Sequence, residues 1–204
     1  QIASALPLGD EAHGALRRYA PRGLVQDIDA RWRGPWPHLQ QYQIKGRATD
    51  LALAAPPADA APGYQPQDFG LRGASVSFDL NQGGGKAQLA IAQGALALPG
   101  VFEEAVVPLQ RLSATVRWSL QGEQIAVQAS DLRFANADAQ GQAHISWRTS
   151  DPARSPGKSR FPGVLDLQGQ LQRADGTRVR RYLPLSIDAE VRHYVRDAVQ
   201  AGTS

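Results

Sequence analysis

The stretch LSATVRWSLQGEQIAVQA, residues 112–129, decides the fold of this chain. Apolar and polar residues alternate through residues 112–120, a turn of Gln, Gly and Glu follows, and the alternation then resumes. Successive side chains of a β-strand point to opposite faces, so each half predicts a strand with one apolar and one polar face. The short turn between the halves predicts an antiparallel β-hairpin.

The same alternation recurs along most of the chain. The other regular runs lie at residues 74–80, 87–91, 143–147 and 165–171, and weaker ones at 25–32, 41–49 and 132–134. About ten strands joined by short turns predict a mainly β fold, a large curved antiparallel meander sheet with an apolar concave face. We expect this sheet to occupy residues 24–183.

Two short helices are expected to flank the sheet. Residues 1–23 contain a helical pattern that Asp10 can cap and Pro21 ends, and residues 184–204 contain a second amphipathic pattern. Two proline-rich stretches, 54–67 and 150–162, predict exposed loops. The sequence contains no methionine, so we expect all of residues 1–204 to be one β-rich segment of a longer protein.

Composition excludes several classes of protein. Of the 204 residues 42% are apolar, the formal net charge is +3, and there is no cysteine. These values argue against a disordered chain and exclude disulfides and thiolate metal sites. No run approaches the ~18 apolar residues of a membrane-spanning helix. The basic residues gather between 173 and 196 with few aromatic residues, so we expect no nucleic-acid partner.

The sequence contains no recognisable set of catalytic residues. The four histidines are far apart in sequence and lack a second metal ligand at a suitable spacing, so we expect no metal and no cofactor. Asp27 and Asp29 would lie ~6.7 Å apart on one strand face, within the range of paired glycosidase carboxylates. Arg31 continues that face, which favours solvation. A carbohydrate-active domain is therefore the weakest alternative, and we expect no enzyme.

The apolar face is larger than the helices can cover. Ten strands ~4.8 Å apart make a sheet roughly 48 Å wide, and two helices ~10 Å across cover about 20 Å of it. Either the sheet closes on itself as a sandwich or barrel, which is the commoner solution, or it stays open and its groove receives acyl chains or a partner.

Three segments, residues 16–36, 69–147 and 161–184, carry a resemblance to a known family. The first reads LRRYAPRGLVQDIDARWRGPW, the second contains GLRGASVSFDLNQGGGKAQLAI and LPGVFEEAVVPLQRLSATVRW, and the third ends at a Tyr-Leu-Pro boundary before the last helix. In this pattern the chain resembles the YhdP family of AsmA-like bacterial envelope proteins. The resemblance rests on rhythm and boundaries and includes no catalytic motif.

The resemblance implies a long rod anchored in the inner membrane of a Gram-negative bacterium and reaching across the periplasm toward the outer membrane. It implies a bent antiparallel sheet with an apolar groove that carries phospholipid. This sequence lacks the anchor and is much shorter than family members, which suggests an internal periplasmic segment. The expected partners are phospholipid acyl chains, the rest of the same long chain, and proteins at either membrane. The alternative is a closed β-sandwich that serves as a spacer in an envelope protein.

The resemblance favours the open groove over self-closure, and the alternation then names the residues that would line it. The expected lining consists of Val76, Phe78, Leu80, Leu89, Ile91, Leu112, Val116, Trp118, Ile125, Val127, Phe134, Ile145, Trp147, Leu165 and Leu167.

Overall fold

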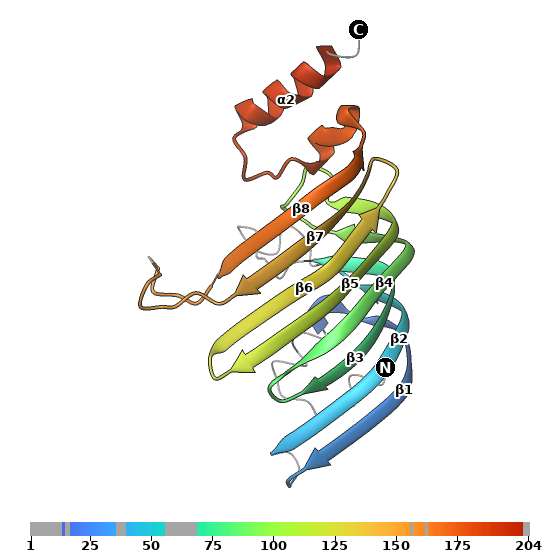
Figure 1. Cartoon of the computed structure of the whole chain (residues 1–204), viewed down its shortest axis with the longest axis vertical. Helices are drawn as coiled ribbons and strands as arrows, with labels where there is room; N and C mark the ends of the chain where they lie inside the picture. Colours follow the sequence, from blue (N-terminus) through green and yellow to red (C-terminus); the bar gives the residue numbers. More distant parts are fainter. Residues whose placement is uncertain are drawn as a thin grey trace.

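One antiparallel sheet dominates the computed structural model, which describes residues 14, 17–35, 40–55, 69–155, 157–161 and 163–201 (Figure 1). Its strands are β1 (Arg22–Arg33), β2 (Gln41–Leu53), β3 (Gly70–Asn81), β4 (Gly84–Ala97), β5 (Val106–Gln121), β6 (Gln124–Ala135), β7 (Ala139–Arg148) and β8 (Val164–Ala174). Each strand pairs with the next one in the sequence, so the order in the sheet is the order in the chain.

The predicted antiparallel meander is confirmed, and the sheet is open, so the alternative of a sheet closed on itself is wrong. Strands β1 and β8 are the two edges of an open sheet and do not pair with each other. The described residues form eight strands instead of about ten, because residues 132–134 continue β6 without a break. Eight strands ~4.8 Å apart place the two edges about 34 Å from each other.

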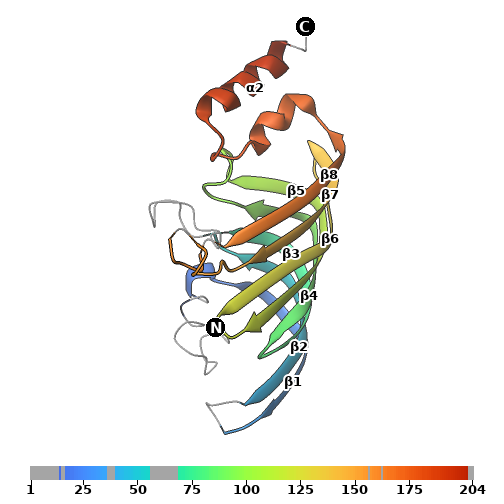
Figure 2. The same cartoon turned by 60° about the vertical axis from the view of Figure 1, so that its left-hand side comes forward.

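The C-terminal part of the chain folds beyond β8 at one end of the molecule (Figures 1 and 2). It consists of the 3-10 helix η3 (Gly176–Tyr182), which the pattern does not predict, and the expected helix α2 (Ala189–Ala201). Most of the predicted N-terminal helix lies outside the described residues, of which Gly14 and residues 17–19 are helical. The predicted loop at 54–67 also lies largely outside them.

The sheet is strongly curved (Figure 2), and β-bulges interrupt the strands. Asp27, Asp50 and Asp131 adopt positive φ angles of 53°, 51° and 53°, and each lies at a shift in the pairing register. Aspartate tolerates this left-handed conformation better than most residues. A bulge bends its strand and raises the local twist, so these residues help to curve the sheet.

The deepest packing of the sheet lies on one face, beside the register shifts at Arg72/Ala74 and Ser113/Thr115. Ala74, Ile91, Leu109 and Leu112 are buried there, with exposed fractions between 0% and 6%. We call this cluster the corner. Half-buried residues pack against it, namely Leu51, Leu71, Leu89, Leu96, Val107 and Phe134. The corner is the hydrophobic core of the described sheet.

Candidate functional site

The face that contains the corner carries two apolar rows across the sheet, one from β1 to β8 and the other from β2 to β8. Residues that pair directly across antiparallel strands lie on the same face, so the register traces each row. The first row runs through Ala30, Ile44, Leu80, Gly85, Trp118, Val127, Trp147 and Leu165, one residue from each strand. The second row runs through Gly46, Phe78, Ala87, Val116, Ala129, Ile145 and Leu167.

We call these two rows the open wall. Its larger side chains are half-buried on the inner strands and exposed at the β8 edge, where Leu165 and Leu167 are 62% and 61% exposed. All members of the two rows are apolar. The open wall is thus a continuous apolar surface that runs the whole length of an open sheet.

The register places every predicted lining residue on this face. Ile91 and Leu112 belong to the corner, Leu165 and Leu167 to the exposed edge, and the rest are half-buried. Direct pairs such as Val76 with Leu89 and Leu112 with Phe134 connect the remaining residues to the same face. That this face holds acyl chains stays a prediction.

Several residues of the apolar face were missed by the sequence pattern. Leu51 and Leu53 are out of phase with Ala48, because the bulge at Asp50 resets the alternation. Ile44 stands beside Gly46 and Ala48, and such small residues give a weak apolar signal. An aspartate in an alternating run is at most a weak sign of a bulge, because Asp79 and Asp166 lie in such runs and pair in unbroken register.

The opposite face of the same strands is polar. Behind the open wall, the register pairs Asp29, Lys45, Asp79, Lys86, Arg117, Gln128, Ser146 and Asp166 across the eight strands. Lys45 Nζ lies 3.1 Å from Asp79 Oδ2. A hydrogen bond from Gln43 and the ammonium of Lys45 together lower the pKa of Asp79, so this carboxylate stays charged.

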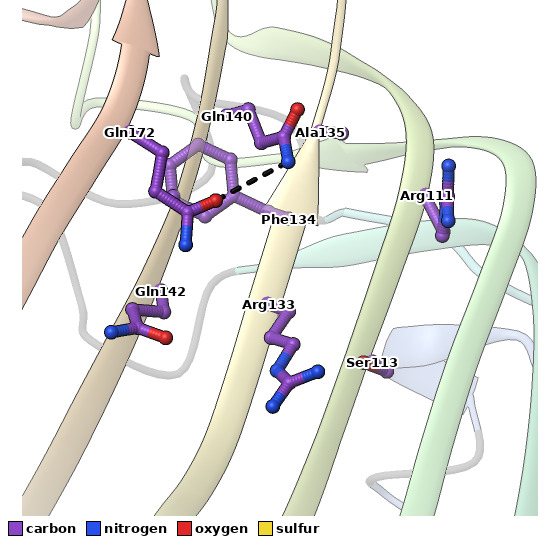
Figure 3. Close-up of a pocket in the computed structure, with 9 residues that line it drawn as sticks. Arg111, Ser113, Arg133, Phe134, Ala135, Gln140, Gln142 and Gln172 are labelled. Atoms are coloured by element: carbon purple, nitrogen blue, oxygen red, sulfur yellow. Dashed lines mark hydrogen bonds between the residues drawn. The ribbon is translucent and has the colours of Figure 1, made fainter.

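A shallow hollow of about 490 Å³ also opens on the polar face (Figure 3). Arg111, Arg133 and Ser113 line it together with glutamines of β7 and β8, and Phe134, Ala135 and Gly141 complete the lining. Gln140 Nε2 donates to Gln172 Oε1 at 3.2 Å, and Gln142 Nε2 donates to Gln170 Oε1 at 3.0 Å. These exposed amide pairs link neighbouring strands in water, and they form no apolar pocket.

The alternative carboxylate pair gains no support from the geometry. Asp27 lies in a bulge with φ 53°, so the regular strand spacing assumed between it and Asp29 does not apply. Asp29 makes an exposed ion pair with Arg31 at 3.4 Å. Among the described residues, no three acidic or histidine side chains form a group that could hold a metal ion.

Charged side chains attach the C-terminal part of the chain to the sheet. Arg181 donates through Nε to Glu104 Oε1 at 2.9 Å and through Nη1 to Asp138 Oδ2 at 2.8 Å. The hydroxyl of Tyr182 donates to Asp138 at 2.9 Å, and Arg192 donates to Glu103 at 2.7 Å. We call η3, α2 and these ion pairs the cap.

The contacts of the cap shift the pKa values of its residues. The hydrogen bond from Arg181 lowers the pKa of Glu104, while burial and the bond to Asp138 raise the pKa of Tyr182. The same loop of Glu104 supplies the carbonyl of Val101, which accepts from the backbone N–H of Leu185 at 2.8 Å. The cap is therefore attached to the β4–β5 loop by both charge and backbone contacts.

The described helices, α2 included, are too short and too polar to span a bilayer. A comparison with known proteins found no matching curated protein and no matching solved structure. One family description, "YhdP protein", does match, and it covers residues 1–204. This match extends over the open sheet, its apolar face and the cap alike. The chain belongs to the YhdP family.

Proposed function

We propose that this chain is a segment of a bridge-like protein that carries phospholipid between the inner and outer membranes of a bacterium. Membership of the YhdP family supports this proposal, because it is consistent with a lipid-transport protein of the AsmA-like kind and suggests the bacterial envelope as its location. The observation that carries the proposal is the open wall, whose first apolar row continues from one edge of the open sheet to the other and whose second row continues from β2 to β8.

An acyl chain is the ligand class that such a surface suits. Each methylene group that moves from water onto apolar side chains gains ~0.8 kcal/mol, and this gain needs no directional contact. The rows offer aliphatic and aromatic groups only, so a tail can shift along them without breaking a hydrogen bond or an ion pair. The charged headgroup would stay in water at the rim of the wall, since its burial is costly.

The open ends of the sheet also fit a conduit. Strands β1 and β8 leave their outer backbone groups without a partner strand among the described residues. Exposed apolar residues continue to both edges, with Trp32 65% exposed on β1 and Leu165 62% exposed on β8. In this proposal further strands of the same long protein continue the apolar face beyond each edge.

Lipid extraction of the purified chain tests the proposal. After expression in bacteria, the 204-residue chain should retain phospholipid that mass spectrometry identifies, and a lipid-free chain with an intact β-sheet spectrum would contradict the proposal. Ile145→Glu, on the second row, should lower the retained lipid and should block transport in the full-length protein. Ser146→Glu places the same charge on the polar face of the same strand and should leave both unchanged.

A further inference from the structure

Three glycines inside the strands pair directly with aromatic residues of the apolar face. Gly46 on β2 pairs with Phe78 on β3, Gly85 on β4 with Trp118 on β5, and Gly141 on β7 with Phe134 on β6. Glycine weakens a strand interior, because it packs no side chain and loses much entropy on folding. Its repeated use opposite an aromatic residue therefore calls for a reason in packing.

The rings lie over these glycines. A Cβ atom built on Gly46 would lie 2.8 Å from Cζ of Phe78, and one built on Gly85 would lie 2.5 Å from Cζ2 of Trp118. On Gly141 the nearest ring atom of Phe134, Cε1, would be 3.1 Å away. Figure 3 shows the Phe134 ring extending from β6 across β7. At Gly46 the three nearest atoms all belong to the Phe78 ring, whereas a Cβ at Gly85 or Gly141 would also meet a backbone oxygen, that of Asp79 at 2.8 Å or of Gln170 at 2.6 Å. Gly46 is therefore the position where the ring alone requires glycine.

A ring that lies down projects less from the sheet than one that stands upright. Side chains of a strand ordinarily stand roughly perpendicular to the sheet, and aromatic residues would then be the tallest on the apolar face. Phe78, Trp118 and Phe134 are half-buried, as expected for rings that lie against neighbouring backbone. Their height is thereby reduced toward that of the aliphatic residues beside them.

We propose that Gly46, Gly85 and Gly141 are positioning residues that keep the lipid path clear by letting the aromatic rings lie flat. This inference rests on the proposed lipid transport. A flat ring offers its broad face to an acyl chain, whereas a raised ring obstructs the path that the chain occupies. The glycines touch no lipid themselves and act only through the ring across the strand.

Gly46→Ala is the most direct test, because the three atoms nearest to its new methyl group all belong to the movable Phe78 ring. Uptake of a phosphatidylethanolamine with a pyrene-labelled acyl chain, from vesicles of phosphatidylethanolamine and phosphatidylglycerol, gives the affinity. If the raised ring removes about two methylene contacts, uptake should weaken about tenfold. Gly46→Ala/Phe78→Ala should take up the probe as well as Phe78→Ala alone, because without the ring the added methyl group obstructs nothing.

Gly169→Ala is the matched control. Gly169 pairs with Ala143 on the same face, and a Cβ there would find no atom closer than 3.8 Å. This variant should take up the probe like the parent chain. Urea unfolding of every variant separates a loss of uptake from a loss of stability.

The outcomes separate this inference from the proposed function. If the parent chain takes up no probe, the proposed function fails. If the parent binds but Gly46→Ala binds equally well, or the double variant binds less than Phe78→Ala alone, the positioning role is wrong. Should Gly46→Ala fail to fold, Gly85→Ala with and without Trp118→Ala is the second comparison; there the backbone oxygen of Asp79, 2.8 Å from the new Cβ, adds a clash that both variants share. If both glycine variants lose the sheet, the glycines are structural and the inference is overturned.

Discussion

The corner and the open wall belong to the same apolar face, yet their surroundings differ. In the corner Ile91 is 1% exposed, because bent strands and neighbouring side chains enclose it. On the open wall, residues made by the same alternation stay half-buried or exposed. One sequence pattern therefore produces both a core and an uncovered surface, and curvature decides which is which. Stability and binding should then respond to different substitutions.

The largest expected effect breaks the corner. Ile91→Ala removes three buried carbon atoms, and such changes in a well-packed core cost about 2–5 kcal/mol of unfolding free energy. Leu167→Ala makes a similar truncation at the exposed β8 edge and should cost less than ~1 kcal/mol. Urea unfolding measures both values. Equal losses at the two sites would show that the open wall is packed like the corner.

The next effect concerns the wall and should change binding more than folding. Val116→Asp places a carboxylate in the second row of the open wall. Because the carboxylate stays hydrated, about two methylene groups of the acyl chain would lose their apolar contact, and lipid retention should weaken about tenfold. Thr115→Asp, the neighbouring position on the polar face, should retain lipid normally. Mass spectrometry of extracted lipid gives the comparison. Loss of lipid in both variants would indicate a general charge effect and contradict the role of the wall.

A smaller effect concerns the bulges that bend the sheet between these regions. Asp131 has φ 53°, a conformation that costs most residues roughly 1–2 kcal/mol. Asp131→Val should therefore lower the unfolding free energy by about that amount, whereas Asp131→Gly should be neutral or stabilising. Thermal or urea unfolding checks the difference. If valine is tolerated as well as glycine, the left-handed conformation is not required in solution.

The smallest effect is local and concerns the cap. Arg181→Gln removes the bonds to Glu104 and Asp138, so hydrogen exchange in residues 176–201 should quicken several-fold while the sheet is unchanged. Arg178→Gln, in the same 3-10 helix, should have little effect. Unchanged exchange in the Arg181 variant would show that backbone contacts alone hold the cap.

Acid should reproduce the effect of Arg181→Gln. The folded state lowers the pKa of Glu104 below its ordinary value of 4.5, so the folded state binds fewer protons than the unfolded one near that pH. The contribution of Glu104 to the stability of the cap is therefore complete above pH 4.5 and declines as the pH falls through the lowered pKa. Exchange rates of the cap, corrected for the intrinsic rate, should rise on acidification in the parent chain and less in Arg181→Gln.

How much of the structure the sequence predicts depends on how far apart the interacting residues are along the chain. The hairpin of β5 and β6 is predictable because its alternation is regular and its turn is short. The bulges at Asp50 and Asp131 are harder to predict, because one residue in an unusual conformation shifts the alternation without changing composition. The cap could not be predicted, since Arg181 and Glu104 are 77 positions apart and no local pattern relates them.

The apolar face shows the same limit. Periodicity assigns Val76 and Leu89 to one face, because alternation is a local property. Whether that face closes depends on how all the strands curve together, and periodicity alone favoured closure. Similarly, the pairing of Gly46 with Phe78 depends on register, which neither strand contains by itself.

Quenching of tryptophan fluorescence by phospholipid with brominated acyl chains tests the central claim most directly. One variant keeps Trp118 and has the other three tryptophans replaced by phenylalanine. A second variant has the same three replacements and combines Arg117→Trp with Trp118→Phe. Its single tryptophan therefore lies on the polar face of the same strand. If acyl chains bind along the open wall, brominated lipid should quench Trp118 strongly and the probe at 117 hardly at all. Equal quenching of both, or quenching of neither, would contradict the account.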